Sequence, residues 1–139
     1  MLGGSGASQR SLITIDTNIV ARFVLNDDPV QSPKARAIIV AGVHVPLTVL
    51  LETAWLFVSR YRMSRETTHQ VLLSFIDLPS VSISEPGPVR WALDRYERGA
   101  DIADMIHIVA SMGAAAFLSF EDKLAEKAGR DSPVPVEKP

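Results

Sequence analysis

Residues 11–26 read SLITIDTNIVARFVLN, a short apolar strand followed at once by a helix. Residues 11–15 form a β-branched run, which is typical of a strand buried on both faces. Asp16 ends this run, and apolar side chains then recur at the spacing of one helix face over residues 18–26. An acid therefore stands where a predicted buried strand meets a predicted helix.

The same alternation continues along the rest of the chain. The predicted strands are residues 11–15, 43–45, 81–84, 115–120 and 134–136. The predicted helices are residues 18–26, 32–40, 46–60, 65–76, 86–99, 102–112 and 121–127. Strands that alternate with helices indicate an α/β fold with a parallel sheet and helices on both of its faces. In open sheets of this kind, ligands bind beyond the carboxyl ends of the strands.

Length and composition fit one globular domain. The chain has 139 residues, of which 47% are hydrophobic and 22% charged. We find no apolar run long enough for a membrane helix and no secretion signal, and the absence of cysteine fits a reducing compartment, so we expect a cytoplasmic protein without a membrane segment. Residues 1–10 (MLGGSGASQR) are interpreted as a flexible leader or as residues added for expression, and residues 11–139 as the domain.

Four carboxylates stand either directly after a predicted strand or within an apolar helical stretch. Asp16 and Glu121 follow the first and fourth predicted strands, so both are expected at the carboxyl edge of the sheet. Glu52 and Asp104 lie within the apolar helical stretches LTVLLETAWLFV and DIADMIHIVASMG. No Lys or Arg stands within five residues of either one, and burying an unpaired charge is costly.

Each acid taken alone also fits an ordinary structural role. Asp16 could cap the helix that follows it, and Glu52 could pair with a distant arginine. Asp101 is expected to cap the helix predicted at residues 102–112. Glu121 and Asp122 could be first-turn acids that the helix dipole favours.

Together the four acids suggest a specific chemistry. Two acids at strand ends and two on helices would converge on one cleft of a layered sandwich, where clustered carboxylates repel one another. Mg²⁺ or Mn²⁺ would relieve that repulsion, because hard cations prefer oxygen ligands. Such a metal can activate water and stabilise charge on a phosphate, so the pattern favours phosphodiester hydrolysis.

Smaller polar residues stand beside these acids. Thr17, Asn18 and Ser119 could orient carboxylates or water, or could be plain caps and turns. His107 shares a helix face with Asp104, but we interpret it as a packed, satisfied histidine.

The formal charge of −2 does not resemble that of a general nucleic-acid binder. A protein of this charge that acts on RNA would need metal ions or local arginine clusters to meet the phosphates. Arg60, Arg62 and Arg65 form the densest basic patch, which is either a solvated helix end or an RNA contact. The large aromatic residues read as core or interface positions: Trp55, Phe57, Phe75 and Trp91.

The order ITIDTNIV, an isolated glutamate in an apolar helix, GADIADMIHIVA and FLSFEDKLAEKAG resembles the PIN domain. More narrowly, the chain is similar to VapC-type toxins of toxin–antitoxin pairs, over residues 12–136. The resemblance implies a single PIN-like domain, a three-layer α/β/α sandwich with a central parallel sheet. It also implies a Mg²⁺- or Mn²⁺-dependent endoribonuclease that forms a homodimer and is neutralised by an antitoxin protein.

The resemblance also assigns residue roles. It implies that Asp16, Glu52 and Asp104 bind the metal, with Asp101 as an accompanying acid. The fourth position departs from the family pattern, because relatives usually read Thr-Phe-Asp where this chain has Ser-Phe-Glu at residues 119–121. Either Glu121 completes the site or Asp122 substitutes for it.

Three other interpretations compete with the PIN resemblance. A phosphoaspartate enzyme of the haloacid-dehalogenase type needs a second aspartate two residues after Asp16, and that position holds Asn18. A receiver domain needs paired acids after the first strand and a lysine after the fifth. The remaining alternative is a PIN-like interaction module that does not cleave RNA.

Overall fold

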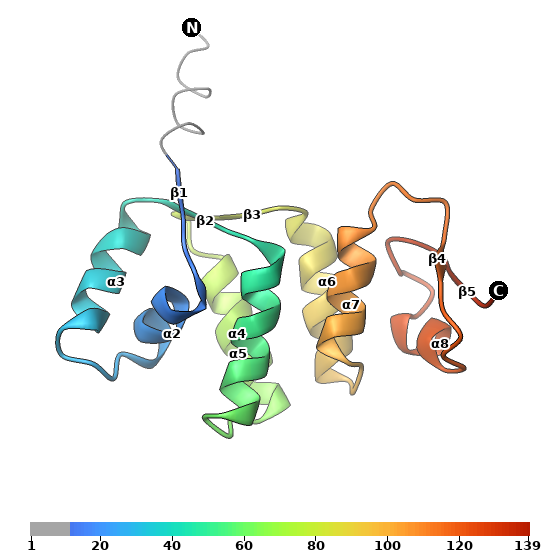
Figure 1. The fold of residues 1–139 in the computed structure, drawn as a ribbon, viewed down its shortest axis with the longest axis horizontal. Coiled ribbons are helices and arrows are strands. Elements are labelled where there is room, and N and C mark those ends of the chain that lie inside the picture. The colour runs from blue at the N-terminus through green and yellow to red at the C-terminus, as the bar shows by residue number, and fades with distance from the viewer. Residues whose placement is uncertain (1–11) are drawn as a thin grey trace, which may run out of the picture.

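The computed structural model describes residues 12–139, so the leader predicted at residues 1–10 lies outside the described part of the chain (Figure 1). The helices are α2 (Thr17–Leu25), α3 (Gln31–Val40), α4 (Leu47–Ser59), α5 (Arg65–Ile76), α6 (Pro86–Glu97), α7 (Ile102–Ala110) and α8 (Leu124–Ala128). The strands are β1 (Ile13–Thr14), β2 (Val43–Val45), β3 (Val81–Ile83), β4 (Phe117–Leu118) and β5 (Val136–Glu137). The protein is therefore a mixed α/β structure with short strands, as the alternation of patterns predicted.

Every strand pairing in the described part of the chain is parallel, but the strands form two sheets. The first sheet has the order β1-β2-β3, with Ile13 opposite Val43 and Val45 opposite Ile83. The second pairs β4 with β5, with Phe117 opposite Val136. In Figure 1, β4, β5 and α8 form the C-terminal end of the molecule, away from the first sheet.

Helices α4 to α7 make up the middle of the molecule, where α4 contacts α5 and α7, and α6 contacts α5 and α7 (Figure 1). Their inward faces supply most of the large buried side chains, which include Leu50, Phe57, Leu72, Leu93 and Met105. Removing this apolar surface from water is the main favourable term that holds the helices together. The core therefore fixes where α4 and α7, the helices that carry Glu52 and Asp104, stand relative to each other.

Local signals account for the helix starts. The Ser64 hydroxyl accepts a hydrogen bond from the Thr67 amide at 3.0 Å, which caps α5, and Pro46 precedes α4 in an extended conformation. Gly99 adopts φ +110° between α6 and α7, a conformation that L side chains rarely adopt. These boundaries agree with those predicted from the sequence.

The segment after β4 differs from the prediction. The helix predicted at residues 121–127 begins only at Leu124, so Glu121 and Asp122 lie in a turn and not in the first turn of a helix. The turn is held by Ser119, whose hydroxyl accepts a hydrogen bond from the Glu121 amide at 3.0 Å. Serine competes well for backbone N–H groups in this way, and the helix starts later as a result.

The aromatic residues divide into two groups. Phe57, Phe75 and Trp91 are buried, as core positions should be. The side chain of Trp55 is 64% exposed, which rules out the core interpretation for this residue and leaves the interface one. None of the helices formed by residues 12–139 combines the length and the apolar character needed to cross a membrane.

Candidate functional site

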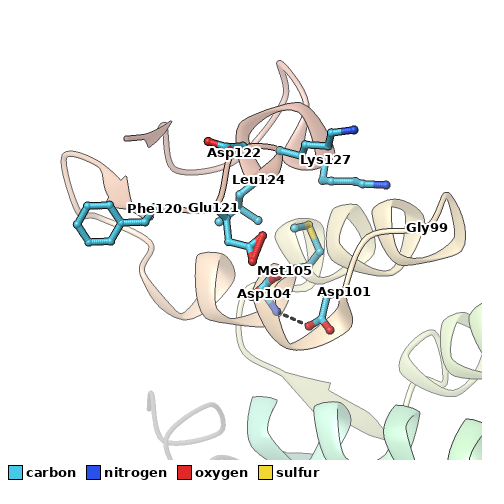
Figure 2. A pocket seen from close by; sticks show the side chains of 10 residues that line it. Gly99, Asp101, Asp104, Met105, Phe120, Glu121, Asp122, Leu124 and Lys127 are labelled. Carbon is cyan, nitrogen blue, oxygen red and sulfur yellow. Dashed lines mark hydrogen bonds between the residues drawn. The ribbon is translucent and has the colours of Figure 1, made fainter. Parts of the chain in front are cut away.

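An open cavity of about 650 Å³ lies between the start of α7 and the turn that precedes α8. Acidic side chains of both segments line it (Figure 2). They are Asp101, Asp104, Glu121 and Asp122. This acidic cavity brings together residues that are about 20 positions apart in the sequence. The segment between them contains the end of α7 and the β4 strand.

Asp101 and Asp104 are placed by the start of α7. The Asp101 carboxylate accepts a hydrogen bond from the Asp104 amide at 3.0 Å, so Asp101 is the helix cap that the sequence predicted. Asp104 follows one turn into the helix and is half-buried. The cap therefore fixes two carboxylates at the same helix end.

The surroundings of Asp104 disfavour its charge. Partial removal from water raises the pKa of the Asp104 carboxyl above its usual value, and the negative charges of Asp101 and Glu121 raise this pKa further. His107, on the same helix face, acts in the opposite direction. Among residues 12–139, none of the ion pairs provides Asp104 with a basic partner. The cavity is thus a place where added positive charge would be favourable.

Glu121 and Asp122 point in different directions. Figure 2 shows the Glu121 carboxylate extending toward Asp104, while the Asp122 carboxylate points away from it. Asp122 instead accepts a hydrogen bond from the Lys138 ammonium at 2.5 Å. The geometry therefore connects Glu121, and not Asp122, to the acids of α7.

A second group of polar side chains joins α2 to α4. The Thr17 hydroxyl donates a hydrogen bond of 2.5 Å to a carboxylate oxygen of Glu52. Asp16, the residue before Thr17, accepts a hydrogen bond from the Ile19 amide at 3.2 Å and so caps α2. Asp16 therefore performs the capping role that the sequence left open. In the sequence it directly precedes Thr17, the hydrogen-bond partner of Glu52.

Glu52 is exposed, which corrects the expectation that it would be a buried charge. The residues of α4 that are buried are Leu50, Thr53, Ala54 and Phe57, so Glu52 lies on the other face of an apolar helix. That face lines a cavity of about 510 Å³ together with Trp55 and with Ala103, the neighbour of Asp104. The Glu52 face of α4 thus looks toward the first turn of α7.

The acids form two neighbouring groups and not one tight cluster. The first group contains Asp101, Asp104 and Glu121, and the second contains Glu52 and its hydrogen-bond partner Thr17, which follows Asp16 in the chain. Within residues 12–139, no group of three or more acidic or histidine side chains lies close enough to hold a metal ion. The carboxylate oxygens are of the kind that Mg²⁺ prefers, but their spacing would have to shrink for them to share one ion.

Two of the expected auxiliary residues take other places. Asn18 lines a separate cavity between α2 and α3, next to Arg22 and Gln31, and not the acidic cavity. His107 is exposed, so the interpretation as a packed histidine is wrong. Thr17 and Ser119, by contrast, do make polar contacts with the acid groups, through Glu52 and the Glu121 amide.

The basic residues are arranged differently from the expectation. Arg65, in the predicted basic patch, donates hydrogen bonds to the carbonyls of Tyr96 and Ala100 at 2.7 and 2.9 Å and covers the Tyr96 ring. It ties α5 to the segment just before α7. The cations that line the acidic cavity are Lys123 and Lys127, which the sequence reasoning missed although they stand four residues apart, at the spacing of one helix face.

No known family and no curated protein matches this chain. The PIN resemblance consequently rests on the sequence motifs.

Proposed function

We propose that the protein is a metal-dependent endoribonuclease of the PIN type that hydrolyses RNA phosphodiester bonds. The observation that carries this proposal is the gathering of the Asp101, Asp104 and Glu121 carboxylates around one open cavity, where they raise the pKa of Asp104. Neighbouring like charges disfavour one another's ionised forms, and a nearby positive charge relieves this cost. A divalent cation would provide that positive charge, and it could bind an RNA phosphate at the same time.

The residues that would hold Mg²⁺ or Mn²⁺ are Asp16, Glu52, Asp104 and Glu121. Their oxygens suit a hard cation, and Figure 2 shows that Glu121 already extends toward Asp104. When bound, the metal supplies charge stabilisation for a phosphate undergoing in-line displacement. Asp101 caps α7 and so orients Asp104, while Thr17 orients Glu52 through its hydrogen bond.

The biological role that fits this chemistry is the toxin of a toxin–antitoxin pair. We propose a three-layer α/β/α arrangement, a homodimer, and an antitoxin protein as partner. Support for a partner surface comes from α4, where Trp55 and Val58 remain exposed. Exposed apolar side chains that lie together on one face commonly mark a protein interface.

Metal-dependent cleavage of RNA tests the proposal directly. Purified protein is incubated with a mixed-sequence RNA pool in Mg²⁺, in Mn²⁺ and in EDTA, next to an Asp104→Asn variant prepared in the same way. We expect cleavage by the wild-type protein in both metals, none in EDTA, and little or none by the variant. Wild-type protein that is folded but leaves RNA intact in both metals would favour the non-cleaving interaction module.

A further inference from the structure

A second cavity opens directly beside the acidic one and has the opposite charge. It has a volume of about 270 Å³ and lies between the end of α6 and α8. Its lining contains the cations Arg95, Arg98, Lys123 and Lys127, against the single acid Glu126. Lys123 and Lys127 line both cavities, so this basic groove and the acidic cavity share a wall.

The cations of the basic groove are available for a ligand. None of the ion pairs found within residues 12–139 involves Arg98, Lys123 or Lys127, and all three residues are exposed. A concentration of positive charge without carboxylate partners is unusual in a chain whose formal charge is −2. Such a groove attracts anions, and phosphate above all.

Arg95 gives the groove a fixed shape. Its guanidinium donates hydrogen bonds to the carbonyl oxygens of Lys127 and Glu126 at 2.6 and 3.3 Å. These bonds join α6 to the end of α8 and satisfy carbonyls that the short helix leaves without partners. The backbone of Lys127 is therefore held in place relative to Arg98, which follows α6.

An aromatic side chain stands on the other side of the acids. The Phe120 side chain lines the acidic cavity and is 83% exposed. In Figure 2 its ring and the Lys127 side chain lie on either side of the Glu121 carboxylate. Proteins hold single-stranded nucleic acid by two features: a positively charged groove that follows the backbone, and exposed aromatic rings on which unpaired bases stack.

We propose that the basic groove binds the sugar–phosphate backbone of a single-stranded RNA that continues across the acidic cavity to Phe120. This inference rests on the proposed function, and it adds the form of the substrate and the path that it takes. The strand enters over Lys127, its phosphate passes Asp104 and Glu121, and a base beyond that phosphate stacks on Phe120. The two lysines at the shared wall set the position of the strand.

Binding without cleavage tests this path. A fluorescent single-stranded RNA of mixed sequence is titrated with the full-length protein in EDTA, and fluorescence anisotropy is followed at several salt concentrations. The test variant is Lys123→Gln/Lys127→Gln. The matched control is Lys34→Gln/Arg36→Gln on α3, which also removes two positive charges but at the opposite end of the molecule (Figure 1).

We expect the test variant to bind about tenfold more weakly at low salt and to lower the salt slope of log K by about 1.4, because each phosphate contact contributes about 0.7 for a single strand. The control should bind as the wild-type protein does. Equal losses in both variants, or no loss in the test variant, would overturn the proposal. Duplex RNA of the same length that binds as tightly as the single strand would overturn its single-stranded form.

The two proposals fail separately in this design. Cleavage of the same RNA in Mg²⁺ is measured for all three proteins. If the wild-type protein cuts RNA while the lysine variant binds normally, the groove proposal is overturned and the nuclease proposal stands. If the wild-type protein never cuts RNA but binds single strands through the two lysines, the nuclease proposal is overturned and the groove proposal stands.

Discussion

Glu121 and Asp122 are neighbours in the chain, yet their carboxylates stand in opposite electrostatic surroundings. Glu121 extends toward Asp104 and contributes to the raised pKa of that residue (Figure 2). Asp122 is paired with Lys138 at the surface. The sequence left the choice between these two acids open, because only the packing of the turn against α7 decides which one extends toward Asp104.

The Glu121→Gln variant should lose far more activity than Asp122→Asn. We expect single-turnover RNA cleavage to fall by roughly tenfold or more for Glu121→Gln, with a higher Mg²⁺ requirement, because a ligand charge is removed. Asp122→Asn should stay within about twofold of the wild-type rate, since exposed ion pairs contribute little. Both rates are measured across a Mg²⁺ titration. An inactive Asp122→Asn beside a normal Glu121→Gln would assign the fourth acid to Asp122.

Asp104 should make the protein less stable as the pH rises. The folded state holds the pKa of Asp104 above its usual value, so the folded protein binds this proton more readily than the unfolded chain. Stability is therefore lost as the pH rises through the raised pKa and regained as the pH falls toward the ordinary aspartate value of about 3.9.

Replacement of Asp104 by asparagine checks this sign. In EDTA at neutral pH we expect Asp104→Asn to have a larger free energy of unfolding than the wild-type protein, measured by urea denaturation. The difference should shrink as the pH is lowered from about 7 to about 4. A variant that is less stable than wild type across this whole range would show that the Asp104 carboxylate is favourably paired.

At the scale of elements, the sequence predicted the helix starts well, except that of α8, and the strand ends poorly. Ser64 and Asp101 cap the helices at the predicted positions, because a cap bonds to an amide three residues away. The strand predicted at residues 115–120 shrinks to Phe117–Leu118, because its length depends on pairing with β5 at the far end of the chain. Information in the local sequence cannot fix a pairing of that kind.

The candidate site was predicted to a similar degree. The order of the acids placed Asp16, Glu52 and Asp104 on the right elements, but it put Glu121 in a helix where the structure has a turn, and it did not show which side chains meet. The exposure of Glu52 follows from how α4 rotates its apolar side into the core. The contacts of Arg65 with Tyr96 and Ala100 span more than 30 residues, and the sequence could not anticipate them.

The cap of α2 separates two consequences of changing Asp16. Asn is as good a helix cap as Asp, so Asp16→Asn should keep the wild-type stability, whereas Asp16→Ala should lose about 1 kcal/mol. Both variants should fail to cleave RNA, because both remove a carboxylate ligand. Urea denaturation and cleavage assays are run on the two variants together. Normal cleavage by Asp16→Asn would leave Asp16 with its capping role alone.

At the scale of the whole molecule, the charge is divided and not uniform. A chain of formal charge −2 places an acidic cavity and a basic groove side by side, with Lys123 and Lys127 between them. Such a division lets one surface attract a metal ion and the neighbouring surface attract phosphate. Overall charge is thus a poor guide to what this protein binds.

Divalent metal should stabilise the folded protein, because it binds the assembled acids and not the unfolded chain. At a free concentration about 100 times its dissociation constant, the gain is roughly 2.7 kcal/mol. The melting temperature is recorded with and without Mg²⁺ or Mn²⁺, for the wild-type protein and for Asp104→Asn. We expect a rise for the wild-type protein that the variant largely loses. An equal rise in both proteins would place the bound metal elsewhere.

The separate pairing of β4 with β5 has a consequence for how often the site opens. Glu121 is attached to this small C-terminal sheet, while Asp104 belongs to the helical body. Small units with few strands open more often than the core does, so backbone amides of β4 and β5 should exchange their hydrogens sooner than those of α4. Each such opening carries Glu121 away from Asp104, and a ligand that bridges them would slow the exchange of β4 and β5 selectively.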